Sequence, residues 1–182
     1  SVVTHSLTNG ATDTSYPTTG NLQTAWDDFE DPDLYQVDFL IAPGMSSQAD
    51  QVTMVNDLVA TAGTLRKDCV VVASPNREAV VGTTPSAAVT NAVATADLFT
   101  ASSYLIVDNN YIKVYDKFND NYEFIPAASS TAGIMSATDR DAAPWFSPAG
   151  QRRGQYLGVT GLAYNADKSQ RDTLYRANIN PI

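Results

Sequence analysis

Short apolar runs and longer amphipathic stretches alternate in the first half of the chain. Apolar runs at 35–42, 69–73 and 103–107 predict strands, and the continuous run CVVVA is typical of a buried parallel strand. Between them, apolar residues recur at helical spacing over 47–62 and 85–99. This alternation of strand and helix predicts βαβαβ units around a mostly parallel sheet, with helices on its faces.

Polar and small residues mark the ends of these two helices. Ser46 or Ser47 is the expected cap of the first helix, and Gly63 follows it where a C-terminal cap belongs. Thr84 is the expected cap of the second helix, with Pro85 at its first position. The positions expected to face the core are Val52, Val55, Leu58, Val59, Ala62, Val89, Val93, Ala96 and Phe99.

The second half is predicted to begin with an antiparallel meander. The strand at 103–107 is followed by a turn at 108–110, by an alternating segment at 111–115 and by a strand at 122–125. Further on, the pattern predicts a helix of roughly ten residues capped by Ser129 or Ser130, extended backbone over 155–164, and a short helix from Ser169 to Arg176. The predicted fold class is α/β: a βαβαβ core with a mixed sheet flanked by helices, plus the antiparallel meander.

The first 33 residues lack this periodicity. Ser, Thr, Asn, Gly and Asp dominate them, and residues 24–29 alone have the pattern of a short helical turn. We therefore divide the chain into an irregular N-terminal segment, residues 1–33, and an α/β core domain, residues 34–182. The polar start shows no signal-peptide pattern, and no apolar run approaches the roughly 18 residues of a membrane span.

Charge is unevenly distributed along the chain. The net charge of -9 argues against a free-standing nucleic-acid binder, which needs a basic surface. Residues 1–65 carry nine acidic residues and no Lys or Arg, whereas from Arg140 onward six basic residues accompany three acidic ones. This polarity suits head-to-tail contact between identical subunits, and chance clustering on a solvated surface explains it equally well.

Residues for catalysis, metal or cofactor binding are sparse. Cys69 is the single cysteine and His5 the single histidine, which is too few for a zinc site or a disulfide. Neither a phosphate-binding glycine loop nor a hydrolase elbow occurs. Cys69 opens a predicted buried strand, where a structural thiol is expected. We therefore expect no catalytic residue, no metal and no cofactor.

The densest acidic cluster lies before the first predicted strand. It lacks the spacing of a calcium-binding EF-hand, so turns and helix caps are its ordinary interpretation. A docking patch for a basic partner is the alternative. The members of this cluster are Asp27, Asp28, Glu30, Asp31 and Asp33.

One later segment combines prolines, glycines, an aromatic pair and arginines. Pro144 is expected to end the preceding helix, and Pro148 and Gly150 are expected to set a tight turn. Trp145 and Phe146 are large apolar side chains in what is otherwise a loop. We expect them to fasten the loop to the core, and direct contact with another subunit is the alternative.

This segment resembles a motif of the tail sheath proteins of contractile-tailed bacteriophages. That family carries a P-W-x-S/A-P-A-G-x-x-R-G stretch, followed roughly 25 residues later by a G-I-N-P-I type sequence. Asn178 stands where the family often has Gly, and both residues tolerate left-handed backbone. The motif residues and candidate subunit contacts are Pro144, Trp145, Phe146, Ser147, Pro148, Ala149, Gly150, Arg152, Arg153, Gly154, Asn178, Ile179, Asn180, Pro181 and Ile182.

The resemblance implies a mechanical role rather than an enzymatic one. Sheath subunits stack as hexameric rings or helical strands around a tail tube, together with a baseplate and a tail terminator. Contraction drives the tube through the host envelope. The resemblance also implies a place in the virion tail, assembly in the host bacterial cytoplasm, and no direct nucleic-acid binding or membrane insertion. It implies further that this chain is a central fragment, without the parent's C-terminal domain.

Within this interpretation, Arg152 and Arg153 are candidates to meet a neighbour's acidic patch, for which the cluster at 27–33 is the natural counterpart. Three alternatives remain open: a sheath subunit of a related, pyocin-like injection system, an α/β hydrolytic or ligand-binding domain, and a carbohydrate-binding domain on a virion surface. An exposed aromatic row over 104–125 would favour the last.

Overall fold

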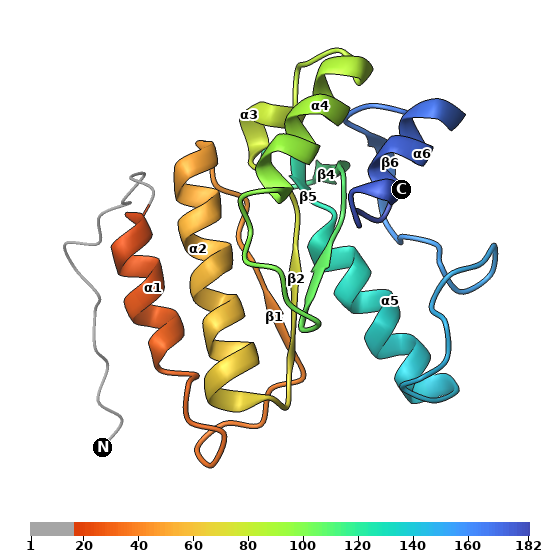
Figure 1. The fold of residues 1–182 in the computed structure, drawn as a ribbon. Helices are drawn as coiled ribbons and strands as arrows, with labels where there is room; N and C mark the ends of the chain where they lie inside the picture. The colour runs from red at the N-terminus through yellow and green to blue at the C-terminus, as the bar shows by residue number, and fades with distance from the viewer. Residues whose placement is uncertain (1–16) are drawn as a thin grey trace, which may run out of the picture.

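The computed structural model describes residues 17–182 as two three-stranded sheets surrounded by helices (Figure 1). The elements in chain order are α1 (Thr19–Asp27), β1 (Phe39–Ile41), α2 (Gln48–Ala60), the π-helical segment η1 (Thr61–Arg66), β2 (Val70–Ala73), α3 (Arg77–Val80), α4 (Pro85–Ala96), β3 (Leu105–Val107), β4 (Tyr111–Asp116), β5 (Asn121–Pro126), α5 (Ala128–Asp141), β6 (Val159–Leu162) and α6 (Lys168–Arg176).

The first sheet is parallel, in the order β1-β2-β3, and side chains alternate between its two faces. One face, which includes Leu40 and Val71, joins the main core with α2 and α4. The other face, which includes Val72, packs against Ala128 and Ala132 of α5. The sheet is therefore the middle layer of three, with α2 and α5 on opposite sides in Figure 1. This confirms the predicted βαβαβ core.

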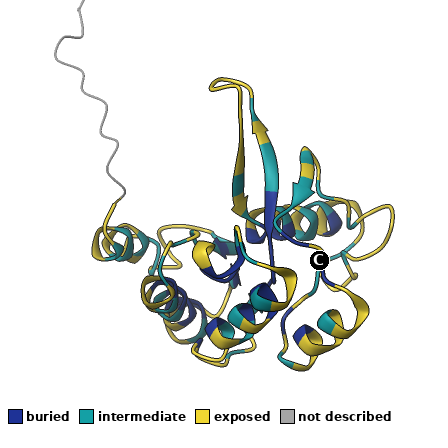
Figure 2. Cartoon of the chain, turned by 90° about the horizontal axis from the view of Figure 1, so that it is seen from above, coloured by how far each residue is buried: buried dark blue, intermediate teal, exposed yellow. Residues whose placement is uncertain are grey.

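The second sheet is antiparallel, in the order β5-β4-β6. Its β4–β5 hairpin is buried at the base and projects from the body of the molecule (Figure 2). β3 was expected in this meander, but it belongs to the parallel sheet, and β6 takes the third place instead. The expectation of one mixed sheet was thus wrong, because the chain changes sheets between Val107 and Tyr111.

Two of the expected helix boundaries at the N-terminal side were wrong. Residues 1–33 were expected to be irregular, yet α1 occupies Thr19–Asp27 and packs Leu22 and Trp26 against the core. Gly63 was expected to cap α2, but the helix continues as η1 and Lys67 takes the left-handed cap at φ 63°. Residues 1–16 lie outside the described part of the chain, and so does His5.

The predicted N-terminal caps of α2 and α4 are correct, and in both the side chain accepts a hydrogen bond from a backbone N–H of the first helical turn. The Ser47 hydroxyl accepts from the backbone of Asp50, and the Thr84 hydroxyl accepts from Ala87. α6 differs from expectation: Asp167, not Ser169, is its cap, and Gln170 closes a capping box with it.

Several expected lengths also differ from the structure. The expected strand over 35–42 is reduced to Phe39–Ile41, and the expected helix end at Phe99 falls at Ala96. α5 begins at Ala128 without a side-chain cap, so neither Ser129 nor Ser130 caps it.

The connection between the two sheets is a buried polar segment, residues 108–110. Asp108, Asn109 and Asn110 are each at most 1% exposed. The Asn109 amide donates to the Tyr164 hydroxyl at 2.7 Å, and the Asn110 amide donates to the Tyr164 carbonyl at 2.8 Å. The sequence predicts a turn here, but the structure has none: Asp108 forms a parallel bridge with Asn180, and Asn109 and Asn110 link it to β4.

Candidate functional site

The first motif segment forms a loop closed on itself after α5. The backbone N–H of Gly154 donates to the Gly150 carbonyl at 2.8 Å. Gly150 has φ 125°, which side chains rarely adopt, and a Cβ on Gly154 would lie 3.1 Å from Gly150 backbone atoms. The two glycines are therefore needed for the loop's shape, which supports the predicted tight turn.

The second motif segment lies beside the parallel sheet. Asn178 has φ 58°, so its departure from the family's glycine is accommodated in left-handed backbone, as expected. Ile179 is buried. Asn180 forms a parallel bridge with Asp108 and donates its N–H to the Val107 carbonyl at 2.8 Å. The end of the chain thus continues the sheet beyond β3.

A groove brings the two motif segments together. Its volume is about 620 Å³. One wall is α5, the second is the loop from Ser147 to Gly154, and the third is formed by Asn180–Ile182. Residues that lie some 30 positions apart in sequence therefore line one concave site.

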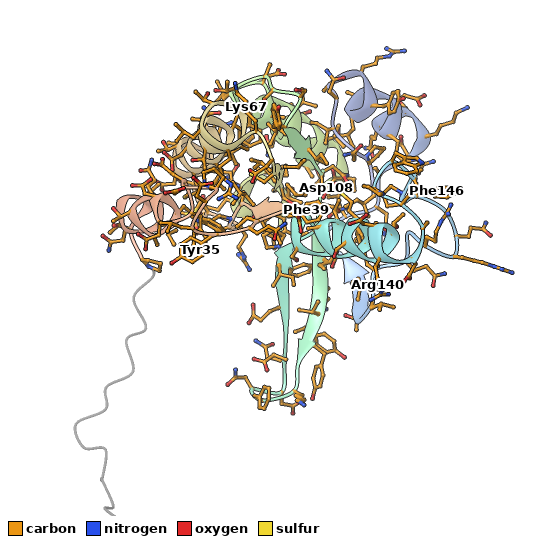
Figure 3. All side chains as sticks on the ribbon, turned by 90° about the horizontal axis from the view of Figure 1, so that it is seen from below. Tyr35, Phe39, Lys67, Asp108, Arg140 and Phe146 are labelled. Carbon is orange, nitrogen blue, oxygen red and sulfur yellow. The ribbon has the colours of Figure 1, made fainter. Side chains whose placement is uncertain are left out.

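The floor of this groove carries a buried carboxyl group. Asp108, labelled in Figure 3, is 1% exposed and follows the carboxyl end of β3. A hydrogen bond from the Thr131 side chain of α5 acts on its carboxyl group. The Thr131 and Tyr156 hydroxyls are 2.6 Å apart. Within residues 17–182, Asp108 Oδ2 has no hydrogen-bond partner. Burial raises the pKa of Asp108 to about 6 and that of Tyr156 to about 12.

A second groove lies on the other side of the loop and holds the predicted arginines. Its volume is about 570 Å³, and Arg152 and Arg153 line it together with Asp141 at the end of α5. The Arg153 guanidinium stacks on Phe146, with 4.3 Å between its carbon and the ring centroid. Among the described residues, the ion pairs are Arg66–Asp68 and Arg140–Asp141, so neither loop arginine is paired with a carboxylate.

The aromatic pair does not fasten the loop to the core as expected. Trp145 is 86% exposed and Phe146 is 44% exposed. The loop is held instead by its own backbone hydrogen bond and by the contact between Phe146 and Arg153. The physical reason is that α5 ends at Asp141 and leads the chain away from the sheet, so the pair meets solvent.

The acidic cluster lies on the opposite side of the molecule. Asp27 and Asp28 end α1, and the loop that follows, with Glu30, Asp31 and Asp33, surrounds Arg66 of η1. Arg66 donates to the carbonyls of Phe29 and Tyr35 at 2.6 and 2.7 Å rather than to the cluster's carboxylates. α1 and the loop after α5 lie at opposite ends of Figure 1, so one copy does not bring the two patches together.

An exposed aromatic row follows the projecting hairpin. Tyr115 and Tyr122 are about half exposed and Phe118, at the tip, is 86% exposed. This is the feature named above as favouring carbohydrate binding. The two tyrosine rings, however, are tilted by 51° to each other and do not form one flat platform.

Within residues 17–182 no group of three or more metal-ligating side chains is found, and no helix is long and apolar enough to cross a membrane.

Sequence reasoning missed the groove floor. Asp108 and Asn109 were interpreted only as a turn, and Thr131 and Tyr156 were not singled out. A signal was present, because polar residues directly after a buried parallel strand lie at the edge of the sheet where ligands usually bind.

Comparison with known proteins identifies several relatives. The family described as phage tail sheath protein central domain matches residues 16–182. The chain is 37% identical over 186 residues to the tail sheath protein of Enterobacteria phage T4, covering 97% of this chain and 28% of that protein. It is 33% identical over 171 residues to the tail sheath protein of Vibrio phage KVP40, covering 86% of this chain and 26% of that protein. The chain thus spans about a quarter of the length of these relatives.

One solved structure shares the fold. A chain from the cryo-EM structure of the anti-feeding prophage baseplate, six-fold symmetrised, superposes with a TM-score of 0.61 at 19% identity. The superposition covers 90% of this chain and 38% of that chain. At this identity the likeness concerns the fold alone.

Proposed function

The chain belongs to the phage tail sheath protein family, as its central domain, and we propose that it is part of a structural subunit that polymerises around a tail tube and contracts. Contraction drives the tube through the host envelope. The partners are other copies in rings or a helical sheath, the tube protein, the baseplate and the tail terminator. The subunit assembles in the host bacterial cytoplasm, acts in the virion tail, and performs no chemistry of its own.

The observation that carries this proposal is the position of the two family motifs. Both line one groove over α5, on the side of the domain opposite the acidic cluster. A subunit with different surfaces at its two ends forms heterologous, head-to-tail contacts, which grow into rings or filaments. Exposed charged surfaces can be exchanged at lower cost than a dry apolar interface, and a contracting sheath must exchange its contacts.

Within this proposal, Arg152 and Arg153 meet the acidic cluster of a neighbouring copy. Both are exposed and neither is paired with an acid among the described residues, whereas Asp27, Asp28 and Asp31 are exposed on the far side. Opposite charges on the two ends steer encounter and set orientation.

The test is a double charge reversal, Arg152→Glu with Arg153→Glu, in the full-length sheath protein that carries this domain. We expect a folded subunit with a slightly lower melting temperature, because Arg153→Glu removes an exposed stacking contact with Phe146. We also expect a large loss of sheath tubes in negative-stain electron microscopy. Lys168→Glu with Arg176→Glu, on exposed positions of α6, changes the net charge equally and is the control. Normal tubes from the loop variant, or equal loss from the control, would contradict the proposed pairing.

A second candidate is a sheath subunit of a related contractile injection system. The fold shared with a chain of the anti-feeding prophage baseplate is compatible with it, while the higher identity to phage relatives favours a phage tail. Electron microscopy of native particles separates the two, because a phage tail carries a DNA-filled head and an injection system does not.

A further inference from the structure

The groove between the two motif segments has a charged floor and apolar walls. Asp108, almost fully buried, supplies the floor, and its Oδ2 has no hydrogen-bond partner within residues 17–182. The walls are formed mostly by Ile106, Ile134, Met135, Pro148, Pro181 and Ile182. We propose that this groove is a binding site for a lysine or arginine side chain supplied by a neighbouring copy of the sheath protein. The inference rests on the proposed assembly of copies.

The buried carboxylate calls for a cationic partner. An ionised carboxylate without a partner is costly to bury, and proteins pair such groups or neutralise them. Tyr156 is the titratable side chain that faces Asp108 among the described residues, and like any tyrosine it is neutral near pH 7, the more so because burial raises its pKa to about 12. Thr131 is the other polar neighbour, from α5. No basic side chain of the same copy forms an ion pair with Asp108 in the described chain.

The shape of the groove selects the class of side chain. A volume of about 620 Å³ admits a long side chain. Lysine and arginine place their aliphatic stems along apolar walls and carry the charge at the tip. A cation at the floor reaches the carboxylate of Asp108, while its stem lies against Met135 and Pro148.

A neighbouring copy is the source that the charge distribution favours. The nearest loop arginines, Arg152 and Arg153, line the groove on the other side of the loop and do not line this one. Basic side chains such as Lys67 and Lys117 are exposed, so every copy presents cations to other copies. Because the groove is formed by one end of the domain, filling it from another copy is a heterologous contact of the polymerising kind.

The deciding variant is Asp108→Asn, which keeps the shape and removes the charge. In the unassembled full-length subunit the carboxylate has no cation, so we expect the variant to melt at the same or a higher temperature at pH 7.5. In assembly the variant leaves the neighbour's cation unpaired, so we expect the critical concentration for sheath formation to rise roughly tenfold or more. Asp139→Asn, on the exposed side of α5, is the control and should change neither quantity.

Each other outcome overturns the inference. A lower melting temperature of the unassembled Asn variant means that the cation comes from the same subunit. Unchanged assembly of the variant means that no cation binds Asp108. If wild-type protein forms no sheath at all, the proposed function fails rather than this inference.

The pH dependence of assembly tests the same pair in the wild-type protein and does not depend on a variant that folds. The pair requires ionised Asp108, so the critical concentration should rise as the pH falls from 7.5 to 5, through the raised pKa of this group. Assembly at pH 5 that equals assembly at pH 7.5 overturns the proposal.

Discussion

At the scale of single residues, Arg66 holds together the segments around the acidic cluster. Its side chain is fully buried and binds Asp68 at 2.9 Å as well as the carbonyls of Phe29 and Tyr35. The hydrogen bond from Arg66 holds the pKa of Asp68 below its ordinary value. One guanidinium thereby fixes the loop after α1, which carries the acidic cluster, to the end of η1.

Replacing Arg66 by Ala should therefore destabilise the domain. Three carbonyls, those of Phe29, Asp31 and Tyr35, and the Asp68 carboxylate lose their donor. We expect the free energy of unfolding to fall by about 2–4 kcal/mol in urea titrations. Arg140→Ala is the matched control, because both side chains of its pair with Asp141 are exposed, and we expect no resolvable change in stability. Equal effects of the two variants would show that the buried bonds contribute little.

At the scale of elements, α5 both covers one face of the parallel sheet and lines the two grooves. One face packs Ala128 and Ala132 on the parallel sheet. The other sides carry Thr131, Ile134 and Thr138 into the two grooves beside the motif loop. A displacement of this helix therefore changes its packing on the parallel sheet and the shape of both grooves together.

The base of the β4–β5 hairpin lies close against the loop after β1 at Gly44. A Cβ there would lie 2.6 Å from Pro126 at the end of β5 and 2.7 Å from the buried hydroxyl of Tyr111. That hydroxyl donates to the Pro75 carbonyl at 3.0 Å and has little freedom to move. Gly44 is therefore a contact point between the loop after β1 and the base of the hairpin.

Gly44→Ala should lower stability by about 1–3 kcal/mol, because the added methyl overlaps fixed atoms. Gly133→Ala, inside α5 with open space at its Cβ, should instead raise it by about 0.5–1 kcal/mol. Thermal unfolding of both variants measures these opposite changes in stability. A stabilising Gly44→Ala would mean that the hairpin base shifts freely.

Elements were predictable where a local signal and burial agree. The run from Cys69 to Ala73 and the caps at Ser47 and Thr84 are such cases. α1 was missed because its sequence contains Gly20 and several polar residues. Its support is tertiary: Leu22 and Trp26 contact the core, and the Thr19 hydroxyl donates to Asp50 of α2. The length of a strand also depends on the strand it pairs with. Residues 35–37 were predicted to be part of β1, but β2 pairs only with Phe39–Ile41 of this segment, so the strand begins there.

At the scale of the whole molecule, charge is separated between two ends. The acidic cluster lies near α1, and the unpaired loop arginines lie beyond α5 (Figure 1). The sequence predicted this polarity and the motif loop, but not the groove floor. Asp108 and Thr131 meet because α5 packs on the face of the parallel sheet that carries Ile106 of β3, a tertiary contact that no local pattern encodes.

Charge separation predicts salt-sensitive assembly. Raising NaCl from about 0.1 M to about 1 M shortens the Debye length from about 10 Å to about 3 Å. We expect the rate of sheath formation, followed by light scattering, to fall by about tenfold or more. A rate that is unchanged or higher at 1 M would indicate contacts dominated by apolar surface.

The bridge between Asp108 and Asn180 also determines how the domain bears load. The last residues run parallel to β3 and are tied to it by the Asn180 N–H on Val107 and the Ile182 N–H on the Asn109 side chain. A pull on Ile182 along the strand direction loads these bonds in shear, so they resist together rather than opening one after another. Tension applied at that end therefore passes directly into the central sheet, and the domain transmits it as a stiff body.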